Sequence, residues 1–111
     1  MGVEIELHAG RPVLNWDRSR PTLIRGSYEH GDALAAVLLG VDVQRQGSLG
    51  LVDPYGNTMF NEQQAHASLR DVPGLLQQCS GPAQTAAVLD LEGLLRSCSE
   101  TPGSYLWFVG D

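Results

Sequence analysis

The stretch YLWFV at residues 105–109 consists of five consecutive apolar residues, three of them aromatic. It follows the turn-forming residues Thr101-Pro102-Gly103 and is itself followed by Gly110-Asp111. A short apolar run bounded by turn residues is typical of a strand that is covered on both faces. We therefore expect the C-terminal strand to lie in the middle of a β-sheet.

Residues 3–8 alternate apolar and polar side chains with a period of two, which predicts a strand with one face on a core and the other, carrying Glu4 and Glu6, in water. The turn residues 9–12 then predict an antiparallel return over residues 13–16. A short β-prone run over 22–25, closed by Gly26, is a further candidate strand.

Residues 53–57 combine Asp, Pro, Gly and Asn in the order that favours a tight turn. We expect a hairpin there, with strands over 48–52 and 58–60 on either side.

Three helices are predicted from apolar side chains at helical spacing. The first covers residues 32–41. The second begins at a capping box formed by Asn61 and Gln64, with a kink or restart at Pro73. The third follows Pro82, and its apolar face consists of Ala87, Val88, Leu91, Leu94, Leu95 and Cys98.

These elements predict a single α+β domain over residues 1–111, with three helices packed on a mixed, mainly antiparallel sheet whose central strand is the C-terminal one. A length of 111 residues suits one hydrophobic core. The hydrophobic fraction of 42% is high enough to exclude a disordered chain.

The net charge of −6 repels phosphate backbones and argues against a nucleic-acid partner. The longest apolar run, residues 33–39, has seven residues, far short of a membrane span. Because the first residues read as a strand and not as a secretion signal, we expect a cytoplasmic protein. In that compartment Cys79 and Cys98 are expected as buried free thiols, and a disulfide remains the alternative in a secreted chain.

The sequence has no recognisable catalytic, cofactor or metal motif. Its histidines, His8, His30 and His66, lack the close ligand spacing of a zinc site. There is no nucleophile elbow GxSxG and no lysine for a phosphate-binding loop. We therefore predict no catalytic residue, no cofactor and no metal.

Aromatic residues beside acidic ones are the best candidates for contacts with a basic protein, since aromatic anchors dominate the binding energy of many interfaces. The candidate partner-binding residues are Trp16, Asp17, Tyr28, Glu29, Asp53 and Tyr55. Packing in the core is an alternative role for Trp16.

Two stretches also carry a resemblance: the pattern D-x-x-G-x-T-x-F-N over residues 53–61, and the aromatic strand that ends in Gly110-Asp111. The chain resembles a group of small bacterial proteins with this hairpin and this final strand, which implies a fold but no activity. In type it is similar to immunity proteins that neutralise polymorphic or contact-dependent toxins.

The leading hypothesis is therefore a non-enzymatic protein-binding domain, an immunity protein whose partner is a basic toxin domain. The alternative is a small housekeeping or regulatory domain that forms a homodimer through the 105–109 strand or through a sheet edge. A third hypothesis is an enzyme whose site combines dispersed residues such as His30, Asp32 and Asp53.

Overall fold

A four-stranded sheet forms one layer of the molecule. The computed structural model describes residues 2–10, 22–40, 47–53 and 55–110. The strands are β1 (Val3–His8), β2 (Leu23–Ser27), β3 (Asn57–Asn61) and β4 (Tyr105–Gly110), in the order β2-β1-β4-β3. Each described strand pair is antiparallel, whereas the sequence predicted a mixed, mainly antiparallel sheet. β4 lies between β1 and β3, so the central position predicted for the C-terminal strand is confirmed.

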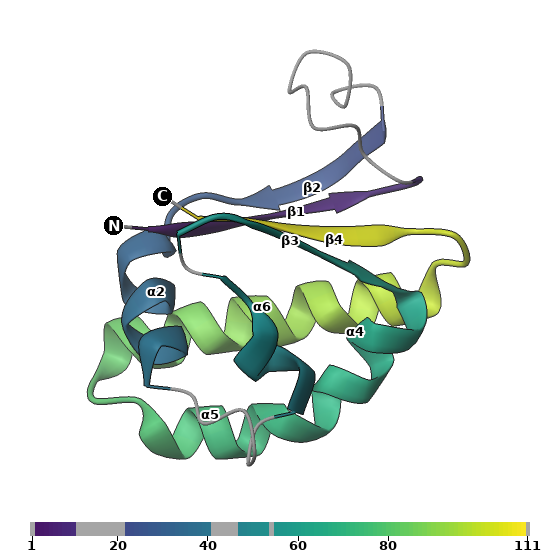
Figure 1. The fold of residues 1–111 in the computed structure, drawn as a ribbon. Coiled ribbons are helices and arrows are strands. Elements are labelled where there is room, and N and C mark those ends of the chain that lie inside the picture. The colour runs from purple at the N-terminus through teal and green to yellow at the C-terminus, as the bar shows by residue number, and fades with distance from the viewer. Residues whose placement is uncertain (1, 11–21, 41–46, 54, 111) are drawn as a thin grey trace.

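The helices cover one face of this sheet, and α6 runs directly beneath it (Figure 1). They are α2 (Gly31–Leu39), α4 (Glu62–Ser68), α5 (Val72–Gln78) and α6 (Pro82–Glu100), with two short 3-10 helices, η2 (Gly47–Leu51) and η3 (Leu69–Asp71). Together α4, η3 and α5 occupy the stretch predicted as one interrupted helix. The predicted α+β class is confirmed.

The core lies between α6 and the sheet. α6 begins at Pro82, where the missing N–H costs nothing because the first turn of a helix has no acceptor for it. From β1 and β4 the core receives Val3, Ile5, Leu7 and Phe108, each at most 2% exposed. The side chains that α6 buries are the six predicted from the sequence: Ala87, Val88, Leu91, Leu94, Leu95 and Cys98.

The predicted strand over residues 48–52 is wrong, because the chain forms η2 there. Leu49 and Val52 are buried while Leu51 is 66% exposed. Burial at a spacing of three residues suits a 3-10 helix and not a strand, whose period is two. The predicted hairpin is therefore also wrong, and β3 pairs with β4 instead.

The other predictions at the N-terminal edge of the sheet have mixed outcomes. The return strand over residues 13–16 lies outside the described residues. β2 continues to Ser27, so Gly26 lies within the strand and does not close it.

Cys79 and Cys98 are both free thiols. Within the described residues, no helix has the length and apolar character that crossing a membrane requires.

Candidate functional site

The described structure places the partner-binding residues predicted from the sequence at two separate edges of the sheet. Tyr28 and Glu29 follow β2 and are both exposed, whereas Asp53 and Tyr55 are exposed in the turn before β3. β2 and β3 are the two edges of the described sheet, with β1 and β4 between them. Since neighbouring strands are spaced by about 4.8 Å, the two edges lie roughly 14 Å apart. Trp16 and Asp17 lie outside the described residues.

At the β2 edge the ring of Tyr28 lies against Gly26. Gly26 pairs with Glu6 of β1, on the face of the sheet that points away from the helices. A Cβ atom at Gly26 would overlap the Tyr28 ring, so only glycine leaves room for the ring at this position. The Tyr28 hydroxyl then donates a hydrogen bond of 2.8 Å to Oε2 of Glu6.

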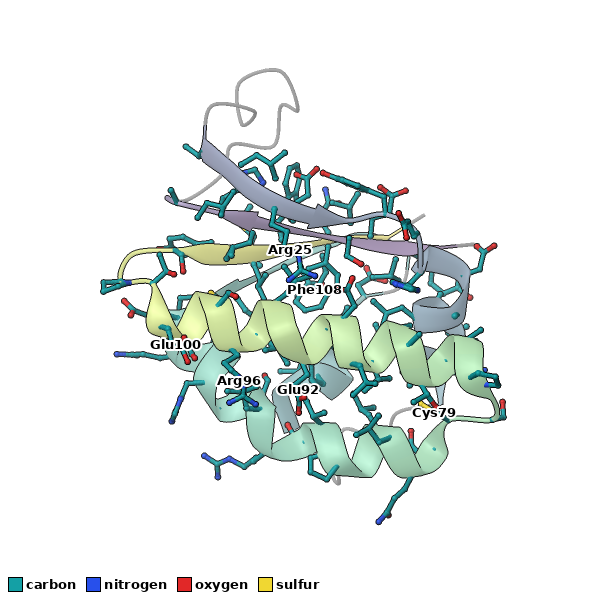
Figure 2. All side chains as sticks on the ribbon, turned by 180° about the vertical axis from the view of Figure 1, so that it is seen from behind. Arg25, Cys79, Glu92, Arg96, Glu100 and Phe108 are labelled. Atoms are coloured by element: carbon teal, nitrogen blue, oxygen red, sulfur yellow. The ribbon has the colours of Figure 1, made fainter. Side chains whose placement is uncertain are left out.

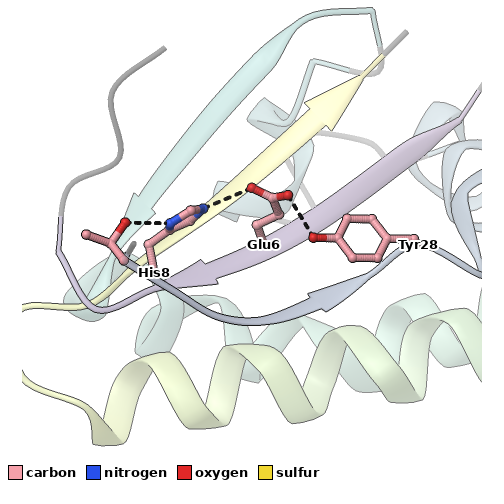
Figure 3. A network of polar contacts seen from close by, with 4 residues as sticks. Glu6, His8 and Tyr28 are labelled. Atoms are coloured by element: carbon pink, nitrogen blue, oxygen red, sulfur yellow. Dashed lines mark hydrogen bonds and ion pairs between the residues drawn. The ribbon is translucent and has the colours of Figure 1, made fainter. Parts of the chain in front are cut away.

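Glu6 also contacts His8, and Figure 3 shows its carboxylate between His8 and Tyr28. Its Oε1 lies 2.9 Å from Nε2 of His8, and Nδ1 of His8 lies 2.8 Å from the Thr22 hydroxyl oxygen. An ionised carboxylate only accepts hydrogen bonds, so Nε2 carries a proton; in the neutral ring Nδ1 then accepts from the Thr22 hydroxyl. We call these four side chains the Glu6 network.

Burial makes this mutual pairing necessary. The side chains of His8 and Glu6 are 1% and 5% exposed, although the sequence pattern placed Glu6 in water. A buried carboxylate or imidazole is costly unless it is paired and hydrogen-bonded. Each Glu6 oxygen has a donor, and each His8 nitrogen has a partner. The prediction that this face of β1 is solvated is therefore wrong at these two residues.

Burial and the Glu6 network extend the pH range over which Tyr28 stays protonated. Burial, the hydrogen bond to Glu6 and the charges of Glu6 and Glu4 raise the pKa of Tyr28 from 10.0 to about 12. Near neutral pH the hydroxyl is therefore a donor. Gly26 and Glu6 both contact the hydroxyl end of the ring.

A carboxylate, an imidazole and a hydroxyl linked in one row by hydrogen bonds are also the three groups of a hydrolytic triad. Catalysis requires that a substrate reach the nucleophile and its base. His8 is fully buried here, and its nitrogens are occupied by Glu6 and Thr22. The described contacts of His8 and Tyr28 hold the Glu6 carboxylate between them.

The described structure shows no assembly of the dispersed enzyme site that the sequence suggested. Asp53 binds its own turn, because its carboxylate accepts from the Tyr55 N–H at 2.9 Å. Among the described residues, no hydrogen bond or ion pair joins Asp53 to His30 or Asp32. The described residues also contain no group of three or more His, Cys, Asp or Glu side chains suited to hold a metal.

A shallow pocket of about 230 Å³ lies beside Tyr28, between the β2 edge and α6. Arg25 and Ser27, on the helix side of β2, both donate to the carboxylate of Asp90 on α6. Figure 2 shows Arg25 between the sheet and α6. Besides these three residues, the lining includes Gly26, Tyr28, Glu29 and His30.

The outer edge of β2 is open in the described structure. β2 pairs with β1 on one side, and no described strand lies on the other. Two large apolar side chains flank this edge, Ile24 at 52% and Tyr28 at 48% exposure. An edge strand presents unpaired N–H and C=O groups that can pair with another chain.

Sequence reasoning identified Tyr28 and Glu29 but missed Glu6, His8, Arg25 and Asp90. A period-two pattern assigns Glu6 and His8 to the wet face, and their partners Tyr28 and Thr22 lie 22 and 14 positions from them. Asp90 pairs with Arg25, 65 positions away. No local signal reports contacts of this range.

No family model matches this chain, and no curated protein or solved structure is significantly similar to it. The arrangement of the described residues is therefore the basis for a functional proposal.

Proposed function

We propose that the chain is a non-enzymatic protein-binding domain of the immunity-protein type, which neutralises a basic toxin domain by binding it across the β2 edge. The observation that carries this proposal is the outer edge of β2, which pairs with no other strand among the described residues and lies between exposed Ile24 and Tyr28. Addition of a partner strand to such an edge is a recurrent mode of protein recognition. Tyrosine beside it is a frequent anchor of binding energy.

Charge supports a basic partner. The chain carries 13 acidic and 7 basic residues, and the exposed Glu29 directly follows Tyr28. Arg25, the basic residue of β2, is already paired with Asp90. Opposite charge on a partner would speed its encounter with this surface and discourage acidic competitors.

The test is co-expression with the toxin domain that this proposal places in a neighbouring gene. Host growth is expected to be rescued by the wild-type chain and by Leu51→Ala, a matched truncation of an exposed leucine away from β2. Ile24→Ala combined with Tyr28→Ala is expected to abolish rescue while the protein stays folded by circular dichroism. If the wild-type chain neither rescues growth nor forms a 1:1 complex with that domain, the proposal is wrong.

Self-association is the second candidate, and the same open edge favours it. β4 is not available for it, because β1 and β3 are paired along both its sides. Of the two edges of the described sheet, β2 carries the exposed apolar side chain Ile24 beside Tyr28, and we propose that it pairs with β2 of a second copy across a two-fold axis. Sedimentation equilibrium over a range of concentrations decides: a dimer that Ile24→Lys dissociates supports this candidate, and a monomer throughout rejects it.

A further inference from the structure

We propose that the exposed part of the Tyr28 ring binds an arginine side chain of the partner. This inference rests on the protein-binding function proposed above. An arginine guanidinium is planar and stacks on aromatic rings, and it is attracted to the negative face of the ring. It is also a residue that a basic protein domain presents at its surface.

The ring is preorganised for this contact. The hydroxyl end of the ring lies against Gly26, where any Cβ would displace it, and the hydroxyl donates to Glu6. Tyr28 is nevertheless 48% exposed, so a substantial part of the ring faces solvent. Rigid side chains lose little entropy on binding, which favours a held ring over a mobile one.

Acidic groups surround the ring. Glu6 accepts from its hydroxyl, and the charge of Glu4 acts on the same hydroxyl. Glu29 lines the pocket beside the ring. The one arginine in that pocket, Arg25, is compensated by Asp90. Among the described residues, an additional cation over Tyr28 therefore meets the negative charges of Glu4 and Glu29.

The probe is N-acetyl-arginine amide, titrated into the ¹⁵N-labelled full chain and followed by amide chemical shifts. N-acetyl-citrulline amide, which has the same shape without the charge, is the matched ligand control. Arginine amide is expected to shift the amides of Gly26, Tyr28 and Glu29, and citrulline amide is expected to bind about threefold to fivefold more weakly.

Two variants separate the ring from general acidity. Tyr28→Leu is expected to remove these shifts, whereas Tyr55→Leu, at an exposed tyrosine on the opposite edge, keeps them. Equal binding of both ligands, shifts that survive Tyr28→Leu, or shifts confined to other regions would overturn the proposal. Because the probe is a small molecule, failure of the toxin co-expression test leaves this result independent.

Discussion

At the scale of single residues, the buried polar face of β1 determines how the candidate surface is built. Glu6 is paired on one side with His8 and on the other with Tyr28. Loss of one partner would leave a buried acceptor without a donor, which costs about 1–3 kcal/mol. The requirement to satisfy Glu6 therefore fixes the position of an otherwise exposed tyrosine, and Gly26 supplies the space.

Tyr28→Phe tests this coupling through its pH dependence. The pKa of Tyr28 is about 12 in the folded chain and 10.0 is its ordinary value, so between these values the folded state holds the proton more tightly. The stabilisation from the hydroxyl is therefore complete below pH 10 and is lost as the pH rises toward 12. We expect the wild-type chain to be more stable than Tyr28→Phe at neutral pH, and the difference to shrink over this range.

Urea unfolding of both proteins from pH 8 to 12 measures this difference. Burial also raises the pKa of the Cys98 thiol, but Cys98 is present in both proteins and cancels in the comparison. A stability difference that stays constant across the range would contradict the predicted coupling.

At the scale of elements, long periodic segments could be predicted from the sequence and short ones could not. The buried face of α6 follows from its spacing alone, because 19 residues give several repeats of the helical period. Residues 47–51 give too few, and two glycines leave the local backbone preference open. Their conformation is set by where Leu49 and Val52 meet the core, which is a tertiary contact.

The difference between local patterns and tertiary contacts also decides which parts of the site could be predicted from the sequence. Tyr28 and Glu29 were identified because an aromatic residue beside an acid is visible in the sequence. The contacts that hold Tyr28 depend on strand register, which places Gly26 opposite Glu6. A register between β1 and β2 is fixed by pairing and not by any motif in either strand.

Asn61→Ala tests the start of α4. The Asn61 side chain accepts from the Gln64 N–H at 2.8 Å, and the Gln64 side chain accepts from the Asn61 N–H at 2.9 Å. Removing the cap is expected to cost about 0.5–2 kcal/mol. Gln63→Ala, at an exposed position in the first turn, should stay within about 0.5 kcal/mol. Chemical denaturation gives both values, and equal effects of the two variants would argue against the capping box.

Leu91→Ala and Leu89→Ala form a matched pair on α6. Leu91 is fully buried and Leu89 is 50% exposed. Deleting the Leu91 side chain leaves a cavity beneath the sheet and is expected to cost about 2–5 kcal/mol. Leu89→Ala removes the same atoms at a solvent-exposed position and should cost less than about 1 kcal/mol. Denaturant midpoints measure both, and a similar loss from the two would mean that α6 buries a different face.

At the scale of the whole molecule, the two-layer arrangement divides the surface into different roles. The helices cover one face of the sheet and shield the core (Figure 1), while the outer edge of β2, beside Tyr28 and Glu29, pairs with no other described strand. Four of the seven arginines lie within residues 11–25, so the remaining chain has 12 acids against three arginines, Arg45, Arg70 and Arg96. Under the proposed function, a basic partner is expected to be attracted by most of the chain and oriented by the β2 edge.

The salt dependence of association tests this division. Wild-type association with the basic toxin domain is expected to slow as salt increases, because screening beyond about 10 Å becomes effective near 0.1 M salt. Glu29→Gln and Glu100→Gln remove the same charge, but Glu29 lies beside Tyr28 whereas Glu100 is at the C-terminal end of α6 (Figure 2). Stopped-flow association rates at several salt concentrations should therefore fall more for Glu29→Gln than for Glu100→Gln. Equal effects would mean that net charge alone steers the partner, and a larger effect of Glu100→Gln would place the interface away from β2.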